Sequence, residues 1–258
     1  MRIFAIPAAM LIACFIYLPL PKAAEYFERG LRALYKQTLR LFTRKNGSSD
    51  HHPALGMYIF LLCGVCMLLG AMHPLVSLFL MTPLFTGLAV LPGCAGMERE
   101  LDSGKYADDI PTYESLVRES CASVAPAFVN SVIVPLLLCG IFMPLHMAVP
   151  AGYAYAALCA LAAENETAVK IIDRIQRIAE KIFIFFMTLC SGVKGRNPLN
   201  IRGKTAETRL LSIVGIAGDS TDTHAPMAGD IAQGIFLCFF STAIFCFTLC
   251  AVGFVVCF

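Results

Sequence analysis

The chain has 258 residues, of which 58% are apolar and 15% are Asp, Glu, Lys or Arg. Soluble domains carry about 25% charged residues, so this composition argues against an ordinary water-soluble fold and favours a protein whose solvent is lipid. The net charge of +2 gives nucleic-acid binding no support, and the mean hydropathy is +0.72. The competing interpretation is a soluble protein with several wholly buried helices.

Repeated uncharged runs of nearly 20 residues match a hydrocarbon core about 30 Å thick. They predict an all-α, polytopic integral membrane domain over residues 1–258, with five to six spans and amphipathic surface helices. The expected spans are 3–20, 54–72, 75–92, 124–143, 150–163 and 235–257, and it stays open whether the fifth continues to residue 190. A cleaved signal peptide competes for the first run, but that run is longer than the usual apolar core of 7 to 15 residues.

Twelve cysteines do not indicate a disulfide framework here, because nearly all of them lie inside apolar runs and act as small, soft apolar residues. Cys63 and Cys66 have CxxC spacing within an expected span. No second pair follows at zinc-site spacing, so we predict neither a redox nor a zinc site.

The stretch Ser120–Leu161 holds two apolar runs joined by the sequence PLHMAVP. We interpret it as a helical hairpin in the membrane, around which the rest of the chain is arranged. In this interpretation Ser123 is the N-cap, Pro126 lies in the first turn, and Pro144 and Pro150 bracket the turn.

Residues 21–44 form the clearest amphipathic segment. At about 100° per residue its cations share one face and its large apolar residues the opposite one. The cations are Arg29, Arg32, Lys36, Arg40 and Arg44, and the apolar residues are Phe27, Leu31, Leu34, Leu41 and Phe42. Such a helix is expected to lie flat at the headgroups, with its apolar side in the acyl boundary.

The distribution of Lys and Arg predicts the orientation. Segments 21–53, 94–122 and 191–233 carry most of the cations, whereas the turns at His73 and His146 carry none. By the positive-inside rule the long segments are cytoplasmic and both termini face outward. The titratable residues then gather on one side, so we expect a site at the cytoplasmic membrane surface.

Three polar features are candidates for that site. Carboxylates clustered between Cys94 and Glu119 suit either a magnesium ion or a solvated acidic face. The sequence GDSTDTHAPMAGD, residues 218–230, brings metal-ligand residue types together without a defining spacing, so no metal site is assigned. Asn130 lies within an apolar run and requires a partner, either across a helix interface or in a ligand cleft.

The order of these features resembles the CobD/CbiB family of cobalamin biosynthesis membrane proteins, and more distantly AmpE-like proteins. Residues Ser123–Pro135 resemble its Ser-Leu-Ala-Glu-Asn-Phe-x-Asp-Gly-x-x-x-Pro motif, and Pro150–Tyr155 resembles Pro-Gly-Ala-x-x-Tyr. Ala225–Gly229 is similar to Ser-Pro-Asn-Ala-Gly. Where the family has Glu-Asn and Asp-Gly, this chain has Pro126-Ala127 and Asn130-Ser131.

The resemblance implies a multi-pass protein of the bacterial inner membrane that joins aminopropanol phosphate to adenosylcobyric acid in an ATP-dependent amide ligation. It would use Mg²⁺ and ATP and would bind a corrinoid. Because most polar positions of the implied site are apolar here, the enzyme assignment stays open, and the alternative is a degenerate member with an accessory, sensing or signalling role. A homo-oligomer also stays open.

No catalytic residue and no metal ligand is assigned. The residues expected to line a substrate site are Asp102, Arg118, Glu119, Asn130, Tyr155, Asp173, Arg174, Asp219, Asp222 and His224. A transporter has less support, because we find neither an inverted repeat nor charges paired inside the spans.

Overall fold

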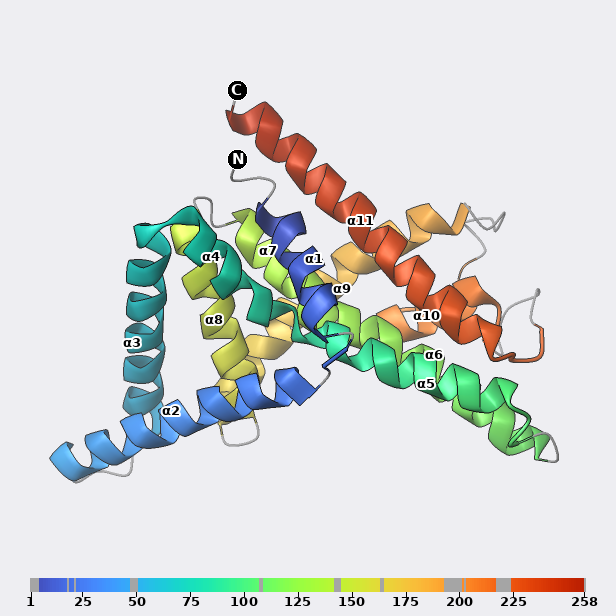
Figure 1. The fold of residues 1–258 in the computed structure, drawn as a ribbon, viewed down its shortest axis with the longest axis horizontal. Helices are drawn as coiled ribbons and strands as arrows, with labels where there is room; N and C mark the ends of the chain where they lie inside the picture. Colours follow the sequence, from blue (N-terminus) through green and yellow to red (C-terminus); the bar gives the residue numbers. More distant parts are fainter. Residues whose placement is uncertain are drawn as a thin grey trace. The chain divides into compact units, whose positions relative to one another are not determined.

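The fold is all-α throughout the residues that this computed structural model describes, which are 5–17, 19–20, 22–46, 51–106, 109–141, 145–162, 165–192, 201, 203–216 and 224–257. This confirms the all-α part of the predicted fold class. The α-helices are α1 (Ala5–Tyr17), α2 (Lys22–Asn46), α3 (His51–Met72), α4 (Pro74–Met81), α5 (Leu91–Asp102), α6 (Ile110–Phe128), α7 (Val134–Ile141), α8 (Leu145–Leu161), α9 (Glu166–Ser191), α10 (Ala206–Val214) and α11 (Gly229–Cys257) (Figure 1). A 3₁₀ stretch, η2 (Thr82–Val90), and a π-helical turn, η3 (Val129–Ile133), complete the set.

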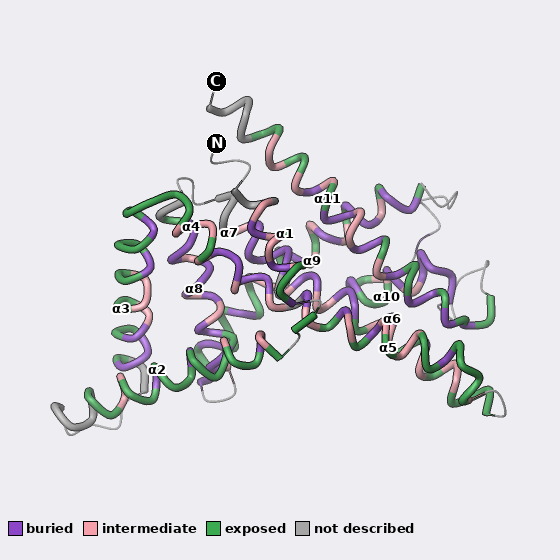
Figure 2. The backbone as a smooth tube through the Cα atoms, in the orientation of Figure 1, coloured by how far each residue is buried: buried purple, intermediate pink, exposed green. Residues whose placement is uncertain are grey.

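Two of these helices are long and apolar enough to cross a membrane, by length and composition. The spans are Pro53–Met72 in α3 and Gly229–Val252 in α11. The number reaches four if Ala8–Tyr17 with Lys22–Leu41, and Pro74–Thr86 with Leu88–Asp102, each count as one broken span. Only 22% of the α3 window is buried, and the exposed side of α3 is visible in Figure 2. Apolar side chains such as Phe60, 77% exposed, therefore suit contact with lipid.

The chain divides into two compact units, one of residues 1–86 and 135–175, the other of residues 87–134 and 176–258. In the first unit α8 packs on α3, and α2 packs on both of them. Gly152 of α8 lies against the Leu84 side chain, which a Cβ at this position would overlap. Glycine therefore permits this close approach. In the second unit α6 packs against α10 and α11.

The predicted break at His73-Pro74 is confirmed. His73 is the N-cap of α4, and its Nδ1 accepts a hydrogen bond from the Leu75 N–H at 3.1 Å. Pro74 occupies the first helical position, where its missing N–H costs nothing.

The predicted start of the central hairpin is wrong. Ser123 lies inside α6, which already begins at Ile110, and its hydroxyl donates to the Ser120 carbonyl at 2.8 Å. The N-cap is Asp109, whose Oδ1 accepts from the Thr112 N–H at 3.2 Å. Asp109 is the stronger signal because the Thr112 N–H, at the third helical position, can donate to it, whereas Pro126 stands at the third position after Ser123 and has no N–H to donate.

Pro126 and Pro150 also lie inside helices, α6 and α8, so Pro150 does not bracket a turn. After Pro126 the helix widens into the π-helical turn η3, and the Val129 N–H donates to both the Ala125 and Pro126 carbonyls. The π-type bond of this turn runs from the Val134 N–H to the Val129 carbonyl, directly before Pro135, so the chain stays helical past both prolines.

Helix α2 confirms the predicted amphipathic helix but divides its apolar residues differently. Leu31 is 4% exposed and faces the protein, and the Phe27 ring lies edge-on to Tyr153 with centroids 5.7 Å apart. Leu34 and Leu41 are 49% and 70% exposed. The sequence pattern identifies an apolar side but not which part of that side contacts protein.

Helix α9 is capped by Asn165, whose Oδ1 accepts from the Thr167 N–H at 3.0 Å. Not all of its apolar residues are buried, because Val169 is 38% exposed. The buried apolar residues of this helix are Ala168, Ile172, Ala179, Phe183, Phe186, Met187 and Cys190.

Candidate functional site

The candidate site lies in the second unit, where the chain enters α11. Helix α10 ends at Gly215, which adopts a left-handed conformation with φ of 98° that glycine tolerates best. The His224 N–H donates to the Gly215 carbonyl at 3.0 Å. This backbone contact fixes His224 beside the end of α10, five residues before α11 begins.

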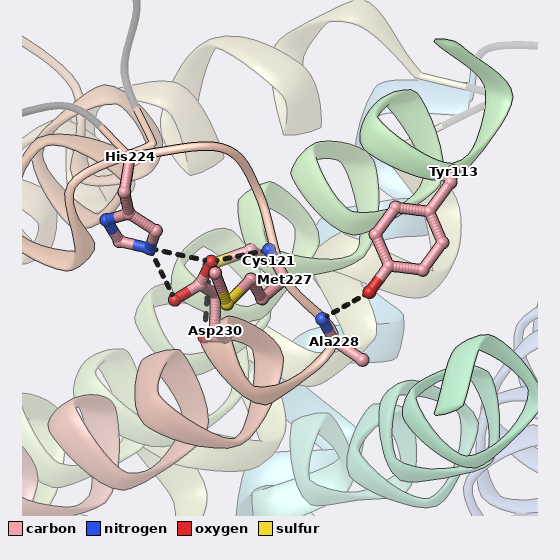
Figure 3. Close-up of polar contacts among 6 residues, drawn as sticks. All are labelled: Tyr113, Cys121, His224, Met227, Ala228 and Asp230. Atoms are coloured by element: carbon pink, nitrogen blue, oxygen red, sulfur yellow. Dashed lines mark hydrogen bonds and ion pairs between the residues drawn. The ribbon is translucent and has the colours of Figure 1, made fainter. Parts of the chain in front are cut away.

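Asp230, in the first turn of α11, is the buried acid of the site. Its side chain is 3% exposed, and its Oδ2 accepts from the Met227 N–H at 2.8 Å. The His224 Nε2 lies 3.0 Å from Oδ1 and 3.1 Å from Oδ2 (Figure 3). A carboxylate is favourable here because unpaired N–H groups and the helix dipole make the start of a helix positive.

The His224 ring connects this acid to the surface, since its side chain is 38% exposed. The pair therefore presents an imidazole to solvent while the carboxylate itself stays buried.

Two residues of α6 complete the cluster. The Tyr113 hydroxyl accepts from the Ala228 N–H at 2.9 Å, and the Cys121 thiol makes a long contact of 3.8 Å to the Asp230 carbonyl. Burial, followed by the Asp230 charge, raises the pKa of Cys121 to about 12. The thiol is therefore protonated at neutral pH, and a protonated, fully buried thiol is a poor nucleophile and metal ligand.

Gly234, one turn further along α11, faces the same thiol. A Cβ at this position would lie 2.9 Å from the Cys121 Sγ, closer than real contacts allow. Glycine therefore allows α11 to approach α6 closely beneath the cluster.

His224 is the predicted site residue that lies in this cluster. Of the other predicted residues in this unit, Asp102, Arg118 and Glu119 are exposed and Asn130 is half-buried in η3. Arg118 pairs with Glu114 at 3.8 Å. No hydrogen bond or ion pair between described residues joins these four to His224 or Asp230.

The remaining predicted residues lie elsewhere. Tyr155 is buried in α8, and Asp173 and Arg174 are exposed on α9, all three in the first unit. Asp219 and Asp222 lie outside the described residues.

Sequence reasoning missed Asp230, Tyr113 and Cys121 as site residues. Asp230 carried a usable signal, because an acid just before the last apolar run marks the start of a helix. Tyr113 carried none, because it meets Ala228 across 115 positions of sequence.

The Mg²⁺ ion that the resemblance implies does not fit this cluster. Magnesium takes oxygen ligands in near-octahedral geometry, but both Asp230 oxygens face His224, and one also accepts from Met227. Within the described parts of the chain, no group of three or more His, Cys, Asp or Glu side chains is placed to hold a metal ion.

Comparison with known proteins found no match, whether to a protein-family model, to a curated protein or to a solved structure. The resemblance to the CobD/CbiB family therefore rests on the sequence motifs. One of these motifs, Ala225–Gly229, lies in the cluster between His224 and Asp230.

Proposed function

We propose that the chain is a divergent multi-pass membrane protein of the CobD/CbiB type that acts without amide-ligase chemistry, in an accessory, sensing or signalling role like that inferred for AmpE-like proteins. The proposal includes the bacterial inner membrane as its location, five to six spans, and cytoplasmic long segments. The apolar helices support the membrane part of it.

The packing of Ser123–Pro135 carries the proposal, because this segment holds the longest motif of the resemblance. Phe128 is 1% exposed, and its ring lies parallel to that of Phe183 and edge-on to that of Phe239, with centroids 6.4 and 5.0 Å apart. The buried residues around it are Val124, Ala125, Val129, Val132 and Ile133. This segment contributes to the core of its unit.

Amide ligation driven by ATP requires carboxylates that hold magnesium and cations that contact the phosphates. Pro126 and Ala127 occupy the positions where the resemblance expects an acid and an amide. Neither side chain can bind a metal ion or a phosphate. The segment is therefore better suited to packing than to catalysis.

The His224–Asp230 pair supports the same proposal. Its hydrogen bonds hold the start of α11, and its imidazole is the part that solvent reaches. This arrangement is suited to detecting a ligand at the end of a candidate span, and it needs no reaction to do so.

The test is amide ligation by the full chain in proteoliposomes supplied with ATP, Mg²⁺, aminopropanol phosphate and adenosylcobyric acid. We expect no amide product under conditions where an authentic synthase, reconstituted in the same way, forms it. The parallel test in cells is growth of a synthase-deficient cobalamin auxotroph, with membrane insertion checked by carbonate extraction.

Product formation by the wild-type chain, lost in the His224→Gln variant, would establish the ligase instead. His224→Gln is preferred for this comparison because glutamine can still donate to Asp230. Its thermal unfolding should be compared with that of the wild type, to separate loss of activity from loss of folding.

A further inference from the structure

Helix α2 lies across the end of a candidate span. In Figure 1 it runs crosswise to α3 and α8, which belong to the same unit. The Tyr58 hydroxyl, in the second turn of α3, donates to the Leu31 carbonyl at 2.9 Å. The Arg32 Nε donates to the Ala160 carbonyl, near the end of α8, at 3.0 Å. The two contacts hold α2 against one end of each helix.

The course of the chain before α2 agrees with this position. The axes of α1 and α2 are bent by 106°. A helix that runs nearly at right angles to its neighbours at the end of a span lies along the membrane surface. Its exposed side chains then meet headgroups and the upper acyl chains.

Three faces divide the surface of α2. The buried face, made of Ala24, Leu31 and Tyr35, contacts the rest of the unit. A second, exposed and apolar face carries Leu34 and Leu41, whose exposed fractions are 49% and 70%. Tyr26, 66% exposed, lies at the edge of this face, and the Arg29 guanidinium lies 5.6 Å from its ring centroid. A third, exposed and basic face carries Arg29, Arg32 and Lys36.

The apolar and basic faces lie on different sides of the helix. Leu34 and Lys36, two positions apart, are separated by about 200° around the axis. Because the protein covers a face between them, one exposed side can enter the acyl boundary while the other contacts headgroups. This is the arrangement of an interfacial amphipathic helix.

Charge selects the kind of lipid. Helix α2 carries seven Lys and Arg against two Glu. Arg29 pairs with Glu25 at 2.9 Å and Arg32 with Glu28 at 3.4 Å, but both pairs are solvent-exposed. Exposed pairs are weak, so phosphate groups compete with these glutamates for the guanidinium groups.

We propose that α2 docks the first unit onto anionic phospholipid, with Leu34 and Leu41 in the acyl boundary and Arg29 and Lys36 on headgroup phosphates. A second copy of the chain is the less favourable occupant, because it would bring two basic helices together. The exposed apolar side chains of α3, a candidate span in the same unit, also suit contact with lipid. The inference holds whether or not the chain has ligase activity.

The test uses the absence of tryptophan from the chain. In the full-length Leu34→Trp variant, the introduced indole is the sole tryptophan, so its fluorescence reports the apolar face of α2. The variant is reconstituted in bilayers of phosphatidylglycerol and phosphatidylcholine, with brominated acyl chains on one lipid or on the other. Tyr26→Trp, an aromatic replacement at the edge of the same face, repeats the measurement should Leu34→Trp fold poorly.

We expect strong quenching at position 34, weaker quenching in a Lys36→Trp variant, and stronger quenching when bromine is on phosphatidylglycerol. Adding Arg29→Gln and Lys36→Gln to Leu34→Trp should reduce that preference by up to about fivefold for each cation at low ionic strength. The matched control adds Lys105→Gln and Arg118→Gln, two exposed cations outside α2, and should leave the preference unchanged.

Four results would overturn the proposal. Absence of quenching in both the Leu34→Trp and the Tyr26→Trp variants would show that the apolar face is outside the bilayer. Crosslinking of two copies of the chain through α2 would identify this surface as a dimer interface instead. Quenching that does not distinguish the two lipids would show binding without selection for anionic lipid. A preference that survives the Arg29→Gln and Lys36→Gln changes would show that these two cations do not contact the headgroup phosphates.

Discussion

Replacing Asp230 by alanine tests whether the buried acid holds the start of α11. The change leaves the Met227 N–H without its 2.8 Å acceptor and His224 without its partner, at a site where the acid side chain is 3% exposed. A hydrogen bond to a charged group, such as this part-buried one, contributes about 1.5–3 kcal/mol, and loss of a negative charge at a helix start costs about 0.3–1 kcal/mol. Together we expect the second unit to open more easily by about 2–3 kcal/mol.

Cys121 provides the measurement, because it contacts the Asp230 carbonyl and is fully buried. Its thiol reacts only when this region opens, so the labelling rate follows the opening equilibrium. With a tenfold change for each 1.4 kcal/mol, Asp230→Ala should speed maleimide labelling of the Cys121 peptide by roughly 30- to 150-fold. Mass spectrometry resolves this peptide from the other cysteines.

Two variants bracket the result. Asp230→Asn keeps an oxygen acceptor for the Met227 N–H and loses the charge, so its rate should lie between those of the wild type and Asp230→Ala. Asp102→Ala removes an exposed acid of the same unit and should not change the rate. An Asp230→Ala rate within about threefold of the wild type would refute the assigned role, because it corresponds to less than about 0.7 kcal/mol.

Three further changes have definite expected outcomes. Tyr113→Phe removes the acceptor of the Ala228 N–H, at a cost of about 1 kcal/mol, and should speed Cys121 labelling about fivefold. Gly234→Ala should lower the thermal unfolding temperature because its Cβ meets the Cys121 Sγ, whereas in a Cys121→Ala background the helix propensity of alanine should raise that temperature instead. The hydroxyl and the N–H of Thr112 lower the pKa of Asp109 from its ordinary 3.8. The pKa of Asp109 is therefore lower in the folded state than in the unfolded state. The cap stabilises the first turn of α6 fully when the pH is above the unfolded-state pKa, and this stabilisation is lost as the pH falls through the folded-state pKa. Amide exchange at the start of α6, corrected for intrinsic rates, should therefore increase at acid pH in the wild type and stay level in Asp109→Asn.

Much of the fold follows from the sequence, because long apolar runs in a chain with few charges have little choice but to form helices. The break at His73-Pro74, the amphipathic α2 and the last helix were all predicted from local patterns. The division of α2 into three faces was not predicted. Leu31 and Leu34 are equally apolar, and only tertiary contacts decide that Leu31 packs against protein while Leu34 is exposed.

The site was less predictable than the fold, because its geometry depends on contacts distant in sequence. His224 was singled out, since histidine and aspartate are close together in its segment. Its partner proved to be Asp230, six residues further on, where the first turn of a helix favours an acid. Tyr113 and Cys121 reach the cluster from α6, more than 100 positions away.

The prolines show why a local rule fails in this chain. Pro74 follows a residue whose side chain caps a helix, and a helix begins there. Pro126 comes 16 residues after α6 has begun, and ending the helix at that point would leave several N–H and C=O groups without partners. In an apolar environment each such group costs several kcal/mol, about as much as the proline itself, so continuing the helix is the more stable outcome. Helical structure accordingly continues past Pro126, where the Val129 N–H donates to the Ala125 and Pro126 carbonyls and the Val134 N–H donates to the Val129 carbonyl. A proline in an apolar run is therefore a weak sign of a helix boundary unless a capping residue stands directly before it.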